Sequence, residues 1–123
     1  MGKYGDIISE FADQSNYGSS TSDPGYVFPG TTGGKCRFLG FCSGRADDNG
    51  RIGYRFFDSS TTDDSKPILY RCNLGDLGNA NACEFLSIFP SGVSIIFNSG
   101  IFFKWDGSSG FREPQSVTIF YQR

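Results

Sequence analysis

Apolar residues at every second position fill the middle and the end of this chain, and this alternation restricts the fold more than any other feature. The first such pattern is Ile52, Tyr54, Phe56. The others are Val93, Ile95, Phe97; Ile101, Phe103, Trp105; and Val117, Ile119, Tyr121. Successive side chains of a β-strand point to opposite faces, so each triplet predicts a strand with one buried face. Together with shorter apolar runs, they predict strands at residues 36–42, 51–57, 68–72, 85–89, 93–97, 101–105 and 117–121.

Turns that contain glycine are expected to join two pairs of these strands. Asp48-Asn49-Gly50 suits a type I′ turn, because Asn-Gly accepts two positive φ values, and it predicts a hairpin between 36–42 and 51–57. Asn98-Ser99-Gly100 predicts a second hairpin between 93–97 and 101–105. Ile96, Phe102 and Phe120 put apolar side chains on the opposite faces of their strands. We attribute this to a sheet that a helix covers on one face and neighbouring segments cover in part on the other.

The N-terminal residues have a different spacing, which predicts a helix. Tyr4, Ile7, Ile8 and Phe11 stand at i, i+3, i+4 and i+7, and so form one apolar stripe. We interpret residues 1–13 as the end of a longer helix, 14–25 as a polar loop and 26–123 as the β region of a single domain. The stripe is expected to dock on the sheet at Val93, Ile95, Phe97 or their neighbours. The predicted fold class is therefore α+β, with a helix stub packed on a mainly antiparallel sheet.

Four cysteines, Cys36, Cys42, Cys72 and Cys83, can form three sets of disulfide pairs. We expect the neighbours to pair, Cys36 with Cys42 and Cys72 with Cys83, in an oxidising compartment. Reduced thiols and a four-cysteine zinc site are the alternatives. The intervals of five and ten residues within the two pairs fit zinc poorly, because zinc knuckles place two to four residues between their cysteines.

The absence of histidine excludes whole classes of chemistry. Ser-His and Cys-His catalysis and histidine-bound metals are impossible without it. The remaining acids stand apart in sequence or lie in polar turns, so we expect no enzyme activity and no cofactor. A net charge of −2 argues against binding of nucleic acid through its phosphates.

Acidic turns and one tryptophan are the other candidates for binding. Asp47-Asp48, Asp63-Asp64 and Asp76 could hold calcium, but turn chemistry explains them as well and they lack the spacing of a calcium loop. Trp105 could form a surface platform for a sugar ring, although a tryptophan at the end of a strand is more often a packing residue.

Short motifs in the β region resemble a known family. They are Ile52-Gly53-Tyr54-Arg55-Phe56, Ile68-Leu69-Tyr70-Arg71, Val93-Ser94-Ile95-Ile96-Phe97 and Pro114-Gln115-Ser116-Val117-Thr118-Ile119. In this order, after a helix stub, they resemble the globular domain of type IV pilin-like proteins, in particular the J/W-type minor pseudopilins and minor pilins. The resemblance implies that the N-terminal transmembrane helix of that family is missing here.

This resemblance also implies a function. The chain would be a structural subunit of a type IV pilus or of a type II secretion pseudopilus, in contact with other pilin or pseudopilin subunits. The missing helix would anchor it in the inner membrane, and the domain would be periplasmic or extracellular. The alternatives are an extracellular module that binds carbohydrate or another surface through Trp105, and a viral coat or decoration protein.

Overall fold

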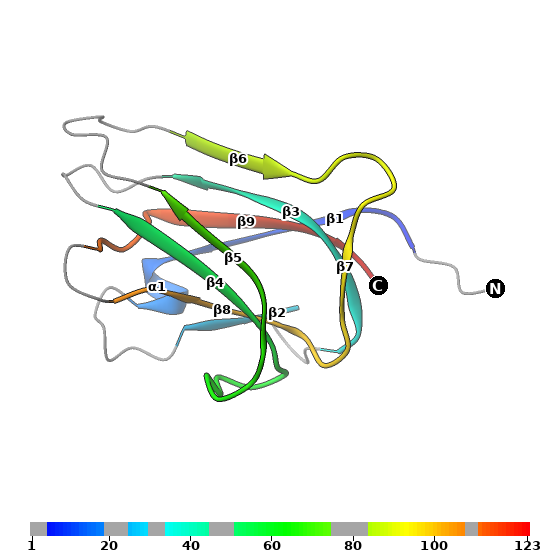
Figure 1. Ribbon diagram of the computed structural model, residues 1–123, viewed down its shortest axis with the longest axis horizontal. Coiled ribbons are helices and arrows are strands. Elements are labelled where there is room, and N and C mark those ends of the chain that lie inside the picture. Colours follow the sequence, from blue (N-terminus) through cyan, green and yellow to red (C-terminus); the bar gives the residue numbers. More distant parts are fainter. Residues whose placement is uncertain (1–4, 19–24, 30–33, 45–50, 75–83, 108–110) are drawn as a thin grey trace.

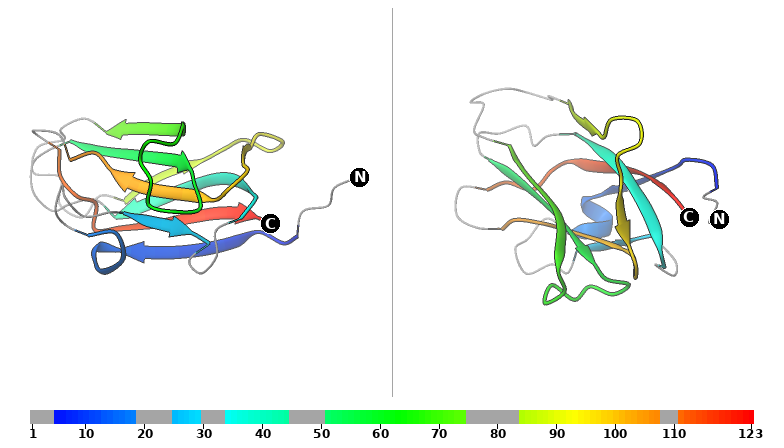
Figure 2. Two further views of the ribbon diagram at one scale, coloured as in Figure 1. Left: turned by 90° about the horizontal axis from the view of Figure 1, so that it is seen from below. Right: turned by 45° about the vertical axis from the view of Figure 1, so that its right-hand side comes forward.

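The computed structural model shows a small all-β domain of two antiparallel sheets that face each other (Figures 1 and 2). It describes residues 5–18, 25–29, 34–44, 51–74, 84–107 and 111–123. The strands are β1 (Ile8–Asp13), β2 (Tyr26–Phe28), β3 (Cys36–Gly44), β4 (Ile52–Asp58), β5 (Ile68–Leu74), β6 (Glu84–Ile88), β7 (Ile95–Phe97), β8 (Ile101–Trp105) and β9 (Ser116–Gln122), and a short helix is α1 (Gln14–Tyr17).

The two sheets take their strands from alternating parts of the sequence. Sheet A has the order β1-β9-β3-β6, and β7 also pairs with β3. Sheet B has the order β2-β8-β4-β5. The last strand of the sequence, β9, thus lies inside sheet A, between β1 and β3.

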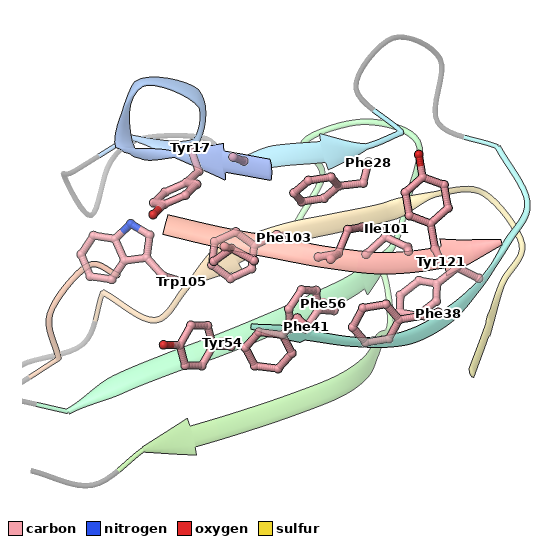
Figure 3. Close-up of a cluster of buried hydrophobic side chains, with 14 of the residues drawn as sticks. Tyr17, Phe28, Phe38, Phe41, Tyr54, Phe56, Ile101, Phe103, Trp105 and Tyr121 are labelled. Atoms are coloured by element: carbon pink, nitrogen blue, oxygen red, sulfur yellow. The ribbon is translucent and has the colours of Figure 1, made fainter. Parts of the chain in front are cut away.

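Aromatic side chains from both sheets fill the space between them (Figure 3). Phe38 of sheet A lies 5.0 Å from Phe56 of sheet B, ring centre to ring centre, and Phe41 lies 4.8 Å from Tyr54. The Tyr54 hydroxyl donates a buried hydrogen bond of 2.7 Å to Ser43 Oγ across the same space. Burial of this much aromatic surface is the main favourable term in the folding of such a domain.

Every strand expected in the β region is present, within a few residues of its predicted bounds. Three of the four alternating triplets are buried in full: Ile52, Tyr54, Phe56; Ile101, Phe103, Trp105; and Val117, Ile119, Tyr121. In the fourth, Phe97 is buried but Val93 is 51% exposed. The alternation therefore gives the correct buried face wherever a strand lies in the middle of its sheet.

The predicted α+β class is wrong, because the N-terminal segment is a strand and not a helix. Among the described residues, strands make up 59% and helix 4%. Residues 8–13 form β1, which pairs with β9 from Ile8 opposite Tyr121 to Asp13 opposite Ser116. The β-branched Ile7 and Ile8 favour a strand, and a helix this short is marginal in water, so pairing with β9 decides the outcome. Helix α1 falls in the predicted loop, and the Asp13 carboxylate caps it by accepting from the Ser15 N–H.

The resemblance to pilin-like proteins is wrong for the same reason. Such a domain needs an N-terminal helix packed on a sheet, and the described part of the chain has no helix of seven residues or more. The quoted motifs are strand segments, but they belong to two facing sheets: residues 52–56 and 68–71 lie in sheet B, and 117–119 lie in sheet A. Alternating apolar residues with tyrosine and arginine between them are common to many sheets, so the motifs identify strands and not a family.

Both predicted hairpins are also wrong. β3 belongs to sheet A and β4 to sheet B, so the connection through the Asp48-Asn49-Gly50 turn passes from one sheet to the other. That turn itself lies outside the described residues. β7 and β8 are divided between the sheets in the same way, and the segment between them is held by an N–H of Ser99 that donates to the Asp58 carboxylate. Glycine turns reverse the chain, but they do not determine which strand becomes the partner.

We expect Phe11→Ala to change the free energy of unfolding by less than about 1 kcal/mol. Phe11 is 59% exposed on β1, and it does not dock on Val93 or Ile95 as the predicted stripe required. Urea denaturation at low protein concentration measures the effect. The matched control is Ile119→Ala, which removes a fully buried side chain from the neighbouring strand and should cost about 2–5 kcal/mol. Equal losses for both variants would contradict the outward orientation of Phe11.

Candidate functional site

The outer side of sheet A carries two rows of side chains that run across its strands. The first row is set by the register of four strands: Phe11 lies opposite Thr118, Thr118 opposite Cys42, and Cys42 opposite Leu86. The second row is Ser9, Phe120, Gly40 and Ile88, paired in the same way. Their sequence neighbours Ala12, Phe41, Val117 and Ile119 are buried. Because side chains alternate along a strand, the side chains of both rows point away from the core, while Gly40 has no side chain and is itself buried. We call these two rows the apolar face.

The apolar face and its margin hold most of the large hydrophobic side chains that the structure exposes. Leu86 is 66% exposed, Phe11 59% and Ile88 48%. Ile7, Val93 and Ile96 lie at the margin and are also exposed. Single exposed apolar residues are ordinary, but a contiguous group of them on a soluble domain marks an interaction surface.

The surface of this face is hollowed at two places. One hollow of about 260 Å³ is lined by Phe11, Cys42, Ser43, Gly44, Ser116 and Thr118. A second, of about 310 Å³, is bordered by Ile7, Arg37, Leu39, Val93, Gln122 and the segment 88–92. Small side chains at the centre and large ones beside them give the face relief into which another surface can fit.

Charged residues are absent from both rows of the apolar face. The guanidinium of Arg37 lies at the margin, where its Nε donates to Ser94 Oγ at 2.8 Å. The outer side of sheet B is different: Arg55 lies opposite both Arg71 and Lys104, and the last two form ion pairs with Asp106 and Asp64. The two rows of sheet A thus carry no charge, whereas the outer side of sheet B has charged side chains beside the exposed Leu69.

Local backbone structure holds β6, with its outward Leu86 and Ile88, against β3. Gly40 lies at an irregularity in the pairing of β3 with β9, and its φ of +132° is a conformation that suits glycine. The absence of a side chain there lets the backbone of β6 approach closely, since a Cβ would collide with the carbonyl oxygen of Ser87. On the inner side, the Ser87 hydroxyl is hydrogen-bonded to Tyr70 of β5 at 3.0 Å.

Trp105 offers no platform for a sugar ring. It is only 5% exposed and belongs to the core, next to Tyr54 and Phe103 (Figure 3). Its indole N–H donates to the Gly18 carbonyl at 3.3 Å. A buried tryptophan with a satisfied N–H is a packing residue.

The predicted pairing of Cys36 with Cys42 is wrong. Cys36, Cys42 and Cys72 all have free thiols. Cys36 and Cys42 lie in the same strand, and six residues of extended chain separate them by about 20 Å, so they cannot pair with each other. Cys36 points into the core, where burial raises its pKa to about 11, whereas Cys42 lies on the apolar face. Cys83 lies outside the described residues.

The other residues considered from the sequence are also accounted for. Ile7, Ile8 and Phe11 are exposed on or beside β1 and do not form a docking stripe, and Tyr4 lies outside the described residues.

The acidic turns have structural partners where they are described. Asp63 accepts hydrogen bonds from Ser65, and Asp64 pairs with Lys104, which lowers the pKa of each carboxyl group. Asp47, Asp48 and Asp76 lie outside the described residues. Within the described ranges, no three acids or cysteines gather into a group that could hold a metal ion.

Polar side chains of β1, β2 and β9 form a small structural cluster. Glu10 Oε1 accepts from the Tyr121 hydroxyl at 2.9 Å, and Glu10 Oε2 accepts from Tyr26 at 3.5 Å. Burial, followed by the bond to Glu10, raises the pKa of Tyr121, so this phenol stays protonated. The cluster joins β1 and β9 of sheet A to β2 of sheet B.

Comparison with protein-family models, with curated proteins and with solved structures finds no match to this chain. The function must therefore be inferred from the described residues themselves. No helix among them has both the length and the apolar character needed to cross a membrane.

Proposed function

We propose that this chain is a non-enzymatic structural subunit that works by packing the apolar face of sheet A against another protein. The exposure of Leu86, Phe11 and Ile88 on one continuous sheet face is the observation that carries the proposal. Burial of apolar area is worth about 25 cal/mol per Å², and these side chains offer that area without charged groups to desolvate. A coat or decoration subunit would work in this way.

Carbohydrate binding, another function expected from the sequence, has less support. Carbohydrate binding through Trp105 requires an exposed ring, and this ring is buried. The apolar character of the two rows fits a protein surface better than a sugar, which needs polar groups directed at its hydroxyls. Protein–protein contact is therefore the preferred function.

Photo-crosslinking in the cells or particles that contain the protein tests this function. We expect a benzoyl-phenylalanine residue in place of Phe11 to form protein adducts, because position 11 lies on the apolar face. The control places the same residue at Leu69, which is 37% exposed on β5 in the other sheet, and it should give none. Mass spectrometry identifies each adduct. Failure of position 11 to give any protein adduct would contradict the proposed function.

A further inference from the structure

The hollow of about 310 Å³ at the margin of the apolar face lies between β3 and the connection from β6 to β7. Residues 89–94 form this connection and run beside β3 (Figure 1). At one end the Phe89 N–H donates to the Leu39 carbonyl at 3.0 Å, and at the other the Ser94 hydroxyl accepts from Arg37 Nε at 2.8 Å. The connection is therefore held to β3 at both ends, and it forms one wall of the hollow.

The hollow has a polar end and an apolar end. Arg37 of β3 lies opposite Gln122 of β9, so their side chains are neighbours on the outer side of sheet A. Leu39 and Ile88 line the hollow further along β3, where Gly40 pairs with Ile88. Three residues of extended strand separate Arg37 from Gly40 by about 10 Å. Arg37 is the only charged residue among the described residues that line the hollow.

We propose that this hollow binds a small apolar carboxylate, with its carboxylate at Arg37 and its apolar chain against Leu39, Ile88 and Val93. Ligand pockets have mostly apolar walls with a few polar groups that orient the ligand, and they begin at roughly 300 Å³. The inference goes beyond the proposed function and does not depend on it, because it concerns one hollow and not packing of the whole face.

The charge of the hollow selects the head group of the ligand. A guanidinium forms charge-assisted hydrogen bonds with a carboxylate, which are about twice as strong as those between neutral groups. The bond to Ser94 holds the Arg37 side chain in place, so less side-chain freedom is lost when a ligand binds. One cation in apolar walls also suits a singly charged carboxylate better than the two charges of a phosphate ester.

Isothermal titration calorimetry of the full chain with octanoate tests the inference. We expect one site per chain, with a dissociation constant of about 1 mM or below for a ligand of this size. Arg37→Gln should weaken binding at least about 10-fold, because the charge is lost. The matched control, Arg71→Gln, makes the same change at a half-exposed arginine of β5 and should leave binding unchanged.

Circular dichroism and urea denaturation establish that both variants fold. Absence of saturable binding to the folded wild-type chain would overturn the inference, and so would equal binding by Arg37→Gln.

Amide chemical shifts from NMR locate the bound octanoate. Those of residues 37–39 and 88–93 should change with saturation, whereas those of Ser43 and Thr118, beside the other hollow, should not. Octylammonium has the same chain with the opposite charge, so it should leave residues 37–39 unchanged. Shifts confined to the other hollow, or equal shifts with octylammonium, would refute the proposed site.

A carboxylate of this kind occurs in a free fatty acid and at the end of a protein chain that ends in an apolar residue. An acetylated tripeptide that ends in leucine distinguishes these sources. Tighter binding of the peptide than of octanoate assigns the hollow to a protein C-terminus, and the reverse assigns it to a fatty acid. The peptide with an amidated end should bind more weakly than the free acid. Failure of octanoate and the peptide alike overturns the inference, while crosslinking from position 11 decides the proposed function separately.

Discussion

Replacement of Phe38 by alanine is expected to lower the free energy of unfolding by about 3–5 kcal/mol. The Phe38 ring is fully buried on β3, and its centre lies between 5.0 and 5.9 Å from the ring centres of Phe56, Tyr70, Phe89 and Phe97. It therefore contacts both sheets and the segment that follows β6. Its removal leaves a cavity where the sheets meet, and the contacts that aromatic pairs make beyond simple burial are lost as well.

Urea denaturation of the two proteins measures this difference, with the slope of the transition showing whether both unfold in one step. Phe38→Leu is the control, because it keeps most of the buried volume and should cost no more than about 1.5 kcal/mol. A loss below about 1 kcal/mol for Phe38→Ala would mean that the ring is not central to the packing of the sheets.

Gly40→Ala is expected to destabilise the domain by at least about 3 kcal/mol, for two separate reasons. The φ of +132° disfavours any residue with a side chain. The added Cβ also collides with the Ser87 carbonyl and lies 2.8 Å from the Ile88 Cα, so β6 must move away from β3. Denaturation measures the loss, and hydrogen exchange at residues 84–88 shows whether β6 has separated.

Gly92→Ala is the matched control for this prediction. Gly92 also has a positive φ, of +84°, but a Cβ there would meet nothing within 4 Å. Its replacement should therefore cost only the backbone strain, about 1 kcal/mol. If the two variants lose the same stability, the close approach of β6 to Gly40 is not what requires glycine at that position.

The strands of the β region could be predicted from the sequence because the alternation of apolar residues within each strand shows which of its faces is buried. Ile101, Phe103 and Trp105 alternate with Phe102 and Lys104, and this local pattern depends little on which strand lies next to them. The partners of each strand could not be predicted in the same way. The turns at 48–50 and 98–100 favour hairpins, but the burial of apolar residues on both sides of the core places the flanking strands in opposite sheets.

The N-terminal segment could not be predicted because its pattern is ambiguous. Ile7 and Phe11 share a helix stripe, but they also lie four residues apart on one face of a strand. Only the register with β9, which comes more than one hundred residues later, separates the two interpretations.

The apolar face could not be predicted from the sequence for a related reason. In the sequence, Ile96 and Phe120 are apolar residues on the face of their strands opposite the predicted core. They were the only indication that this outer face is apolar. Leu86 and Ile88 become part of the same surface only through the pairing of β6 with β3. A surface composed of several strands cannot be recognised before their order is known.

The place of β9 inside sheet A has a consequence for synthesis of the protein. β1 and β3 both pair with β9, and β9 leaves the ribosome after β1 to β8. While translation continues, β1 has no neighbour in its sheet, and neither row of the apolar face can be assembled. The apolar face of a nascent chain can therefore form only after β9 has been synthesised.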